Sequence, residues 1–106
     1  MFVRVLTLDG IDPSTFREFG EAARDRTRPI LQGLEGYKGA MQLLDRDGRR
    51  FRTVVFFESE ENVRAAEPTF ASMPEQLPDQ IRTMVVQAQR SVDVFEVLAT
   101  DRIALG

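Results

Sequence analysis

The sequence has 106 residues, of which 42% are hydrophobic and 29% are charged, as in one ordinary soluble domain. A formal net charge of −3 and a pI near 5.0 argue against nucleic-acid binding, which needs a basic surface. The absence of cysteine excludes disulfides and thiolate sites, and the absence of histidine removes the commonest metal ligand and general base. No Gly-rich phosphate loop lies between a strand and a helix. We therefore expect a single domain over residues 1–106 that uses no cofactor and no metal.

The sequence also indicates the cellular compartment in which the protein is expected. The N-terminal MFVRVLTLDGID has no basic n-region and no long apolar h-region, and the longest apolar run is only Val54 to Phe57. We therefore expect a cytoplasmic protein that does not associate with membranes.

The N-terminal third predicts a strand followed by a helix. Residues 2–8 alternate and are rich in β-formers, which predicts a strand ending at Asp9-Gly10. Asp12 before Pro13 matches an N-cap followed by proline at the first helical position, and Ile11 is placed to pack on Phe16 across that cap. Apolar residues then recur at spacings of three and four. Pro29 lies inside this pattern, so we expect a kink or break near residues 26–28.

The rest of the chain predicts a hairpin, a second helix and a last strand. Tyr37 to Asp45 and Phe51 to Glu58 flank an expected Asp47-Gly48 turn. Ser59 is a suitable N-cap for a helix whose apolar stripe follows, and three prolines predict short helical turns over residues 69–82. A strand over residues 87–99 and a short tail from residue 101 complete the chain.

The element order β-α-β-β-α-β predicts an α+β, ferredoxin-like plait, a four-stranded antiparallel sheet with both helices on one face. The strand from residue 51 to residue 58 is apolar on both sides, with Val54 and Phe56 on one and Val55 and Phe57 on the other. The helices cover only one of these sides. We expect a ligand, a second copy of the chain, or both to cover the other; the alternative is a central strand covered by loops.

Three motifs resemble those of the dimeric α/β-barrel superfamily that includes the antibiotic-biosynthesis-monooxygenase-like proteins. They are Glu35-Gly36-Tyr37-Lys38-Gly39, where the family usually has proline at the first position, Glu58-Ser59-Glu60-Glu61 at a strand end, and the closing strand Ser91 to Val97. The resemblance covers nearly the whole chain. It implies a homodimer in which two sheets pack face to face.

For function, the resemblance implies a pocket between sheet and helices that takes a small hydrophobic or aromatic ligand. Members of the superfamily include cofactor-free monooxygenases of aromatic polyketides and quinols, haem-degrading enzymes, and proteins without known activity. The haem-degrading branch holds iron through a helix histidine, which this chain lacks. We therefore expect a protein that resembles the cofactor-free monooxygenases, or alternatively a non-catalytic ligand-binding or structural homodimer of the same fold.

Asn62 and Tyr37 are the candidate catalytic residues. An oxygenase without metal or flavin must stabilise a substrate anion, and an amide donor at a helix N-terminus suits that task. Asn62 lies on the first turn of the second helix, where it could equally be a surface residue beside the Ser59 cap. Tyr37 could donate to a ligand carbonyl, or it could simply pack at a strand start.

The candidate substrate-binding residues are one cation and four aromatic residues: Arg52, Phe56, Phe57, Phe70 and Phe95. In most proteins, an aromatic set of this kind belongs to the core. Arg52, like Arg4, interrupts an apolar face and could hold an anion or pair across strands with Glu58, Asp93 or Glu96. Glu96 itself could be a buried general base or a solvated charge on an edge strand.

Overall fold

The computed structural model describes residues 1–45, 47 and 49–101 of the chain. The elements, in chain order, are β1 (Phe2–Asp9), α1 (Pro13–Gln32), β2 (Tyr37–Asp45), β3 (Arg50–Phe57), α2 (Glu60–Ser72), the short 3-10 helix η1 (Met73–Gln76), α3 (Asp79–Gln87) and β4 (Gln89–Glu96). The predicted order of strands and main helices is confirmed, with α3 as an additional helix before β4.

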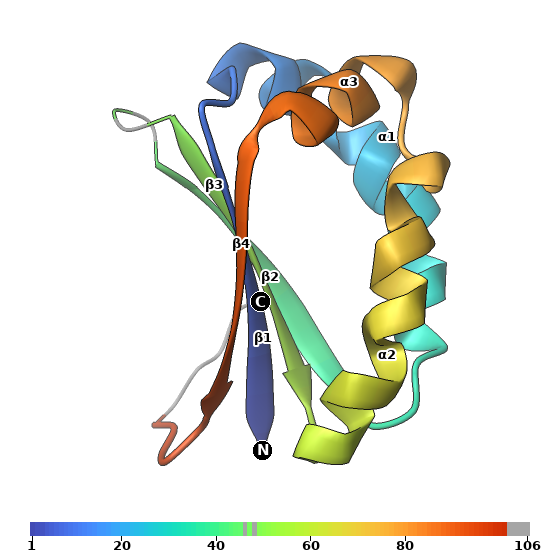
Figure 1. Ribbon diagram of the computed structural model, residues 1–106, viewed down its shortest axis with the longest axis vertical. Coiled ribbons are helices and arrows are strands. Elements are labelled where there is room, and N and C mark those ends of the chain that lie inside the picture. The colour runs from blue at the N-terminus through green and yellow to red at the C-terminus, as the bar shows by residue number, and fades with distance from the viewer. Residues whose placement is uncertain (46, 48, 102–106) are drawn as a thin grey trace.

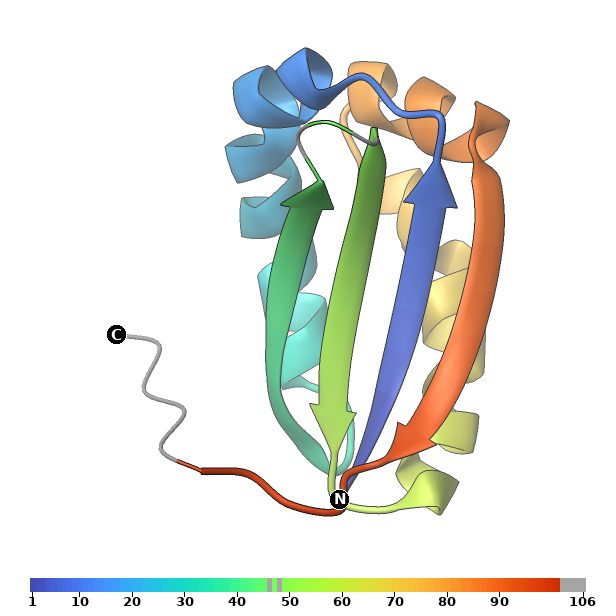
Figure 2. The ribbon, with the colours of Figure 1, turned by 90° about the vertical axis from the view of Figure 1, so that its left-hand side faces the viewer.

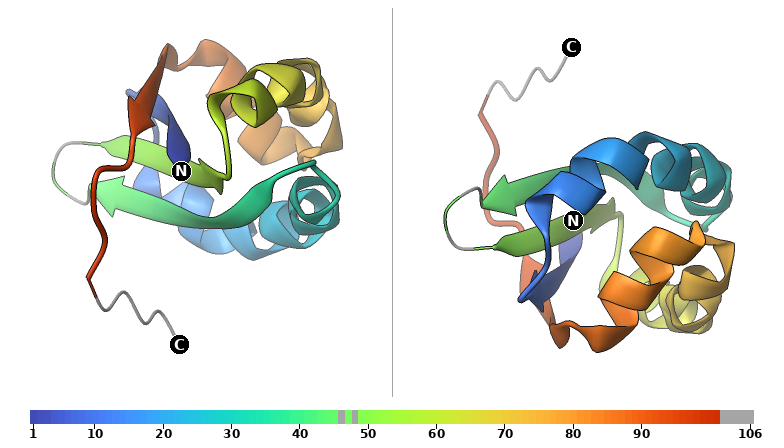
Figure 3. Two further views of the ribbon diagram at one scale, coloured as in Figure 1. Left: turned by 90° about the horizontal axis from the view of Figure 1, so that it is seen from below. Right: turned by 90° about the horizontal axis from the view of Figure 1, so that it is seen from above.

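The four strands form one antiparallel sheet in the order β2-β3-β1-β4, as a ferredoxin-like plait requires. The helices pack on one face of this sheet, and the other face carries no described element (Figures 1 and 2). Within the helix layer, α1 lies on the β2 side and α2 and α3 lie on the side of β1 and β4 (Figure 3). The two central strands, β1 and β3, pair over their full length.

Helix α1 begins as its sequence predicts. The Asp12 side chain accepts a hydrogen bond of 3.0 Å from the Ser14 backbone N–H, and the fully buried Ile11 shares a cluster with Phe16. The helix then continues through Pro29 to Gln32, so a break near residues 26–28 is wrong, and the alternative prediction of a kink stays a prediction. Pro29 removes one backbone donor only, and because it lies exposed near the helix end, water can take the place of that donor.

Helix α2 is capped by Ser59, whose hydroxyl oxygen accepts from the Asn62 backbone N–H at 3.2 Å. The predicted short turns over residues 69–82 consist of the end of α2, then η1, then the start of α3. Pro74 is the second residue of η1 and Pro78 is the N-cap of α3, because the fixed φ of proline suits the start of a helix.

β4 lies within the predicted strand of residues 87–99. Gly48 of the expected turn and residues 102–106 of the expected tail lie outside the described residues. None of the described helices has the length and apolar character needed to cross a bilayer.

Candidate functional site between the sheet and the helices

The core between sheet and helices is divided into two clusters. One lies under α2 and has as its buried members Val55, Phe57, Val63, Ala66 and Phe70. The other lies at the opposite end of the sheet and is built on Leu8, Ile11 and Phe51. Aromatic pairs anchor each cluster: Phe57 meets Phe70 edge to face at 6.3 Å, and Phe16 stacks on Phe51 at 4.2 Å between ring centroids.

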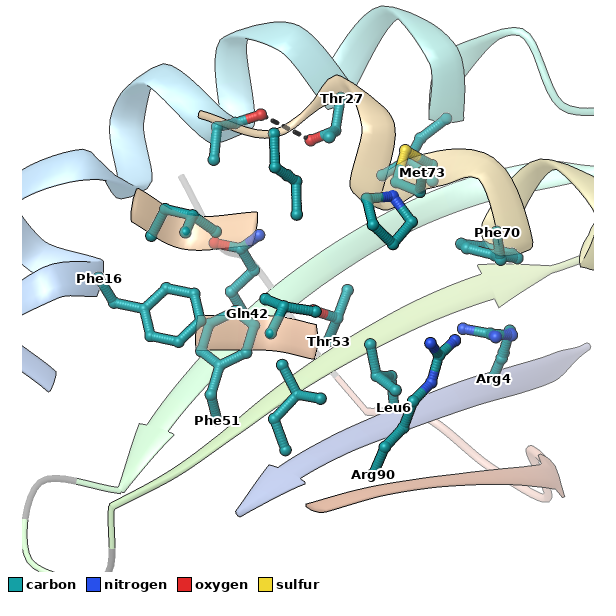
Figure 4. Close-up of a pocket in the computed structure, with 17 residues that line it drawn as sticks. Arg4, Leu6, Phe16, Thr27, Gln42, Phe51, Thr53, Phe70, Met73 and Arg90 are labelled. Carbon is teal, nitrogen blue, oxygen red and sulfur yellow. Dashed lines mark hydrogen bonds between the residues drawn. The ribbon is translucent and has the colours of Figure 1, made fainter. Parts of the chain in front are cut away.

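A cavity of about 120 Å³ lies between these clusters (Figure 4). It arises because small or polar side chains occupy the middle of the facing surfaces: Thr53 on β3, Gln42 on β2, and Ala23 with Thr27 on α1. Thr53 comes between Phe51 and Val55 along the same strand face. None of the four is long and apolar, so the gap between the two clusters is not filled.

The cavity has the size and lining of a site for one aromatic ring. Its walls are mainly apolar and include Leu6, Phe16, Phe51, Phe70, Leu77 and Ile81. An apolar cavity of roughly 150 Å³ in another protein takes up benzene. The lining therefore favours a flat, largely apolar group over a polar metabolite.

Arg4 on β1 brings a guanidinium to the cavity wall. Its side chain is only 3% exposed, lines the cavity, and lies 4.0 Å above the Phe70 ring. Its Nε donates to Glu67 Oε1 at 2.7 Å and its Nη2 donates to Glu67 Oε2 at 3.3 Å. A guanidinium has five N–H donors, and Glu67 uses two of them, so Arg4 keeps donors for a ligand.

Arg90 on β4 is the second cation of the lining. It lies opposite Leu8 in the strand register, and its side chain points from the sheet into the cavity region beside Leu6 (Figure 4). Arg90 is exposed, which places it at an opening of the cavity on the β4 edge. Among the described residues, Arg90 makes no ion pair or side-chain hydrogen bond.

The opposite rim, at the β2 edge, is formed by Gln42 and Arg24. Arg24 Nη1 donates to Gln42 Oε1 at 3.3 Å, and Gln42 lines both the cavity and the grooves outside it. Gly20 permits this arrangement, because a Cβ at that position would lie 3.1 Å from Arg24 Nη1. The two rims therefore differ: one holds a polar pair, and the other holds Arg90, a cation with no partner in the described part of the chain.

Asn62, a predicted catalytic residue, is not among the residues that line this cavity. Its Oδ1 accepts a 2.7 Å hydrogen bond from the Ser59 hydroxyl, and its side chain packs against Gly36. The structure thus gives Asn62 a local role at the start of α2. A catalytic role for it stays a prediction.

Tyr37, the other candidate, packs against the cluster under α2 and lines a groove between α1 and β2, outside the cavity. It lies at the start of β2, opposite Phe57 in the register. Its predicted role with a ligand also stays a prediction.

The predicted substrate-binding set is divided between the two faces of the sheet. Phe70 lines the cavity, and Phe57 lies fully buried in the adjacent cluster. Phe56, Phe95 and Arg52 lie on the face without helices, because each pairs with an outward residue of β1. Substrate binding by these five residues stays a prediction.

The expected cross-strand ion pairs of Arg4 and Arg52 are not those observed. Arg4 pairs with Glu67 of α2, since its side chain points toward the helices. Arg52 Nε donates to the Thr7 hydroxyl at 3.2 Å on the opposite face. Glu96 is exposed at the end of edge strand β4, which favours the solvated charge over the buried base.

Sequence reasoning missed Gln42, Thr53 and Arg90 as lining residues. The signal was present, because Gln42 and Thr53 each interrupt the apolar, helix-facing side of a strand, and Arg90 precedes Val92 and Val94 on the helix-facing side of β4. Within residues 1–45, 47 and 49–101, no three acidic side chains lie close enough together to hold a metal ion.

No protein-family model and no curated protein matches this sequence. Solved structures do match it. A monooxygenase from the gene ActVA-Orf6 of Streptomyces coelicolor, in complex with the ligand nanaomycin D, has a TM-score of 0.69 at 20% identity, over 94% of this chain and 89% of that one. The haem-degrader MhuD of Mycobacterium tuberculosis, with two haems bound in its active site, has a TM-score of 0.69 at 19% identity, over 95% and 99%.

SnoaB, a cofactor-independent oxygenase from Streptomyces nogalater, has a TM-score of 0.65 at 15% identity, over 93% of this chain and 94% of that one. Identities this low establish a shared fold, and function has to be argued from the site. The predicted fold resemblance is confirmed: this chain has the fold of the antibiotic-biosynthesis-monooxygenase structures.

Proposed function

We propose that this protein binds a small phenol-type or quinol-type aromatic compound in the cavity and oxidises it with O₂, without a metal or flavin. The observation that carries this proposal is a one-ring apolar cavity into which the buried Arg4 guanidinium projects. Solved structures of the same fold include a monooxygenase and a cofactor-independent oxygenase, which supports it.

The chemistry requires an electron-rich anion. The phenolate transfers one electron to O₂, and the resulting phenoxyl radical and superoxide combine through a new C–O bond at the para carbon. The proton lost by the phenol protonates the peroxide. The para hydrogen then leaves as a proton while the O–O bond breaks, which yields a para-quinone and one water. Arg4 stabilises the phenolate by charge-assisted hydrogen bonds in a site with little water.

We also propose that a second copy covers the face of the sheet without helices. The outward face of the sheet carries an apolar patch made of Val3, Val5, Met41, Leu43, Val54, Phe56 and Phe95. Polar residues such as Thr7, Arg52 and Asp93 lie beside this patch on the same face. Leu43 and Phe95 are 47% and 55% exposed in the single chain. A specific interface buries about 800 Å² on each partner, and a two-fold axis would place this patch against itself.

Oxygen uptake and quinone formation with a panel of phenols, hydroquinones and anthrones test the activity. Ala23→Met should fill the cavity and abolish both ligand binding and turnover, because Ala23 is a buried lining residue. Ala22→Met is the matched control, since its neighbour Ala22 is exposed on the same helix. Turnover that survives Ala23→Met would exclude this cavity as the site.

The second candidate function is a non-catalytic ligand-binding homodimer. The engagement of Asn62 with Ser59 favours it, because the amide predicted to stabilise an anion is bonded elsewhere. Aromatic binding that Ala23→Met abolishes, without oxygen uptake for any compound, would establish this second function.

A further inference from the structure

We propose that Arg4, Arg90 and Glu67 form an anion subsite that selects ligands with one negative charge. This inference rests on the proposed binding of an aromatic ligand in the cavity, and it adds the charge that the ligand carries. It also assigns Glu67 a role as a positioning residue that sets how much positive charge the cavity presents.

The net charge of the subsite follows from the contacts of Arg4, Arg90 and Glu67. Arg4 and Arg90 are the charged residues of the described lining, and Glu67 lies outside the lining but pairs with Arg4. Two positive charges and one negative charge leave one positive charge uncompensated. That charge belongs to Arg90, which makes no ion pair among the described residues.

Arg4, the other cation of the subsite, contributes selectivity because it is buried. Arg4 is 3% exposed and Glu67 is 47% exposed, so the guanidinium faces the cavity interior while the carboxylate remains partly hydrated. An anion taken into an apolar cavity needs a partner there, because an unpaired buried charge loses far more hydration energy than it recovers. A monoanion satisfies Arg90 and the spare donors of Arg4.

Geometry limits where the anion lies. Arg4 and Arg90 extend from the neighbouring strands β1 and β4 toward the same part of the cavity, near Leu6 (Figure 4). The ring of the ligand then lies toward Thr53 and Phe16, away from the β4 edge. Either a phenolate or a carboxylate offers the oxygen that a guanidinium binds.

Calorimetric titration with three one-ring probes tests this subsite: benzoate, 4-nitrophenolate and neutral methyl benzoate. We expect at least one of the anions to bind about 10- to 100-fold more tightly than the ester, the range for hydrogen bonds to charged groups. The preferred anion tells a carboxylate ligand from a phenolate ligand. Equal affinity for ester and anions would overturn the subsite and leave the cavity proposal standing, whereas failure of all three probes to bind would overturn both.

Substitutions at Arg90 and Glu67 distinguish a role in anion recognition from a role in folding. Arg90→Met, at an exposed position, should lower anion affinity about 10-fold or more and leave ester affinity unchanged. Glu67→Gln should raise anion affinity several-fold, because it removes the competing carboxylate from Arg4. Arg64→Met is the control, since Arg64 is an exposed residue of α2 that pairs with Glu60 at 3.2 Å. Loss of ester affinity in parallel with anion affinity, or no gain with Glu67→Gln, would contradict the proposal.

Discussion

At the residue scale, the contact between the start of β2 and the first turn of α2 depends on Gly36. Gly36 has φ +77°, and a Cβ there would lie 2.9 Å from Asn62 Cβ and closer still to the Asn62 amide. Two independent penalties therefore act on a single substitution: the left-handed backbone, which disfavours a residue with a Cβ, and the clash with Asn62.

We expect Gly36→Ala to lower the free energy of unfolding by about 2 kcal/mol or more, measured by urea denaturation. Adding Asn62→Ala should recover part of this loss, because it removes the amide from the clash but leaves the backbone strain and the 2.9 Å approach of the two Cβ atoms. Asn62→Ala alone should cost about 1 kcal/mol, the value of one hydrogen bond to Ser59. Strict additivity of the two changes would mean that the side chains do not meet in solution.

At the element scale, α1 contains a proline that it accommodates without interruption. Pro29 is exposed and lies three residues before the end of the helix at Gln32, where one missing backbone donor is tolerated. Pro29→Ala should raise the free energy of unfolding by about 1 kcal/mol, since it restores a donor for the Asp25 carbonyl and improves helix propensity. Thermal and urea unfolding measure this change. A destabilised variant would show that the restricted φ of Pro29 outweighs the missing hydrogen bond.

At the scale of the whole molecule, the arrangement of the sheet predicts assembly. Sedimentation equilibrium at micromolar concentration should give twice the chain mass of 12.1 kDa. Phe95→Asp should convert the dimer to a monomer, because it replaces an exposed aromatic residue of the outward apolar patch with a charge. Val86→Asp is the matched control: Val86 is 70% exposed on α3, in the helix layer, so the dimer should persist. A monomeric wild type would end the proposal that a second copy covers the sheet.

Most of the fold was predictable because its signals are local. A few neighbouring positions of the chain are enough to recognise the period of a strand or a helix. The same holds for the helix caps at Asp12 and Ser59 and for the apolar residues on both sides of β3. The continuous α1 was not predictable in this way. Whether a proline breaks a helix depends on its distance from the helix end and on its exposure, and both follow from packing.

The sequence by itself therefore determined the order of the elements, the plait, and a strand β3 that is apolar on both sides. Only the tertiary structure decided which polar residues meet. Arg4 and Glu67 are 63 positions apart and pair because β1 and α2 pack together, whereas the sequence suggested partners on neighbouring strands. The cavity likewise depends on the tertiary structure, because it forms only where small or polar side chains from β2, β3 and α1 face one another. Local patterns specify which face of an element is apolar, and the volume between two such faces is a property of their packing.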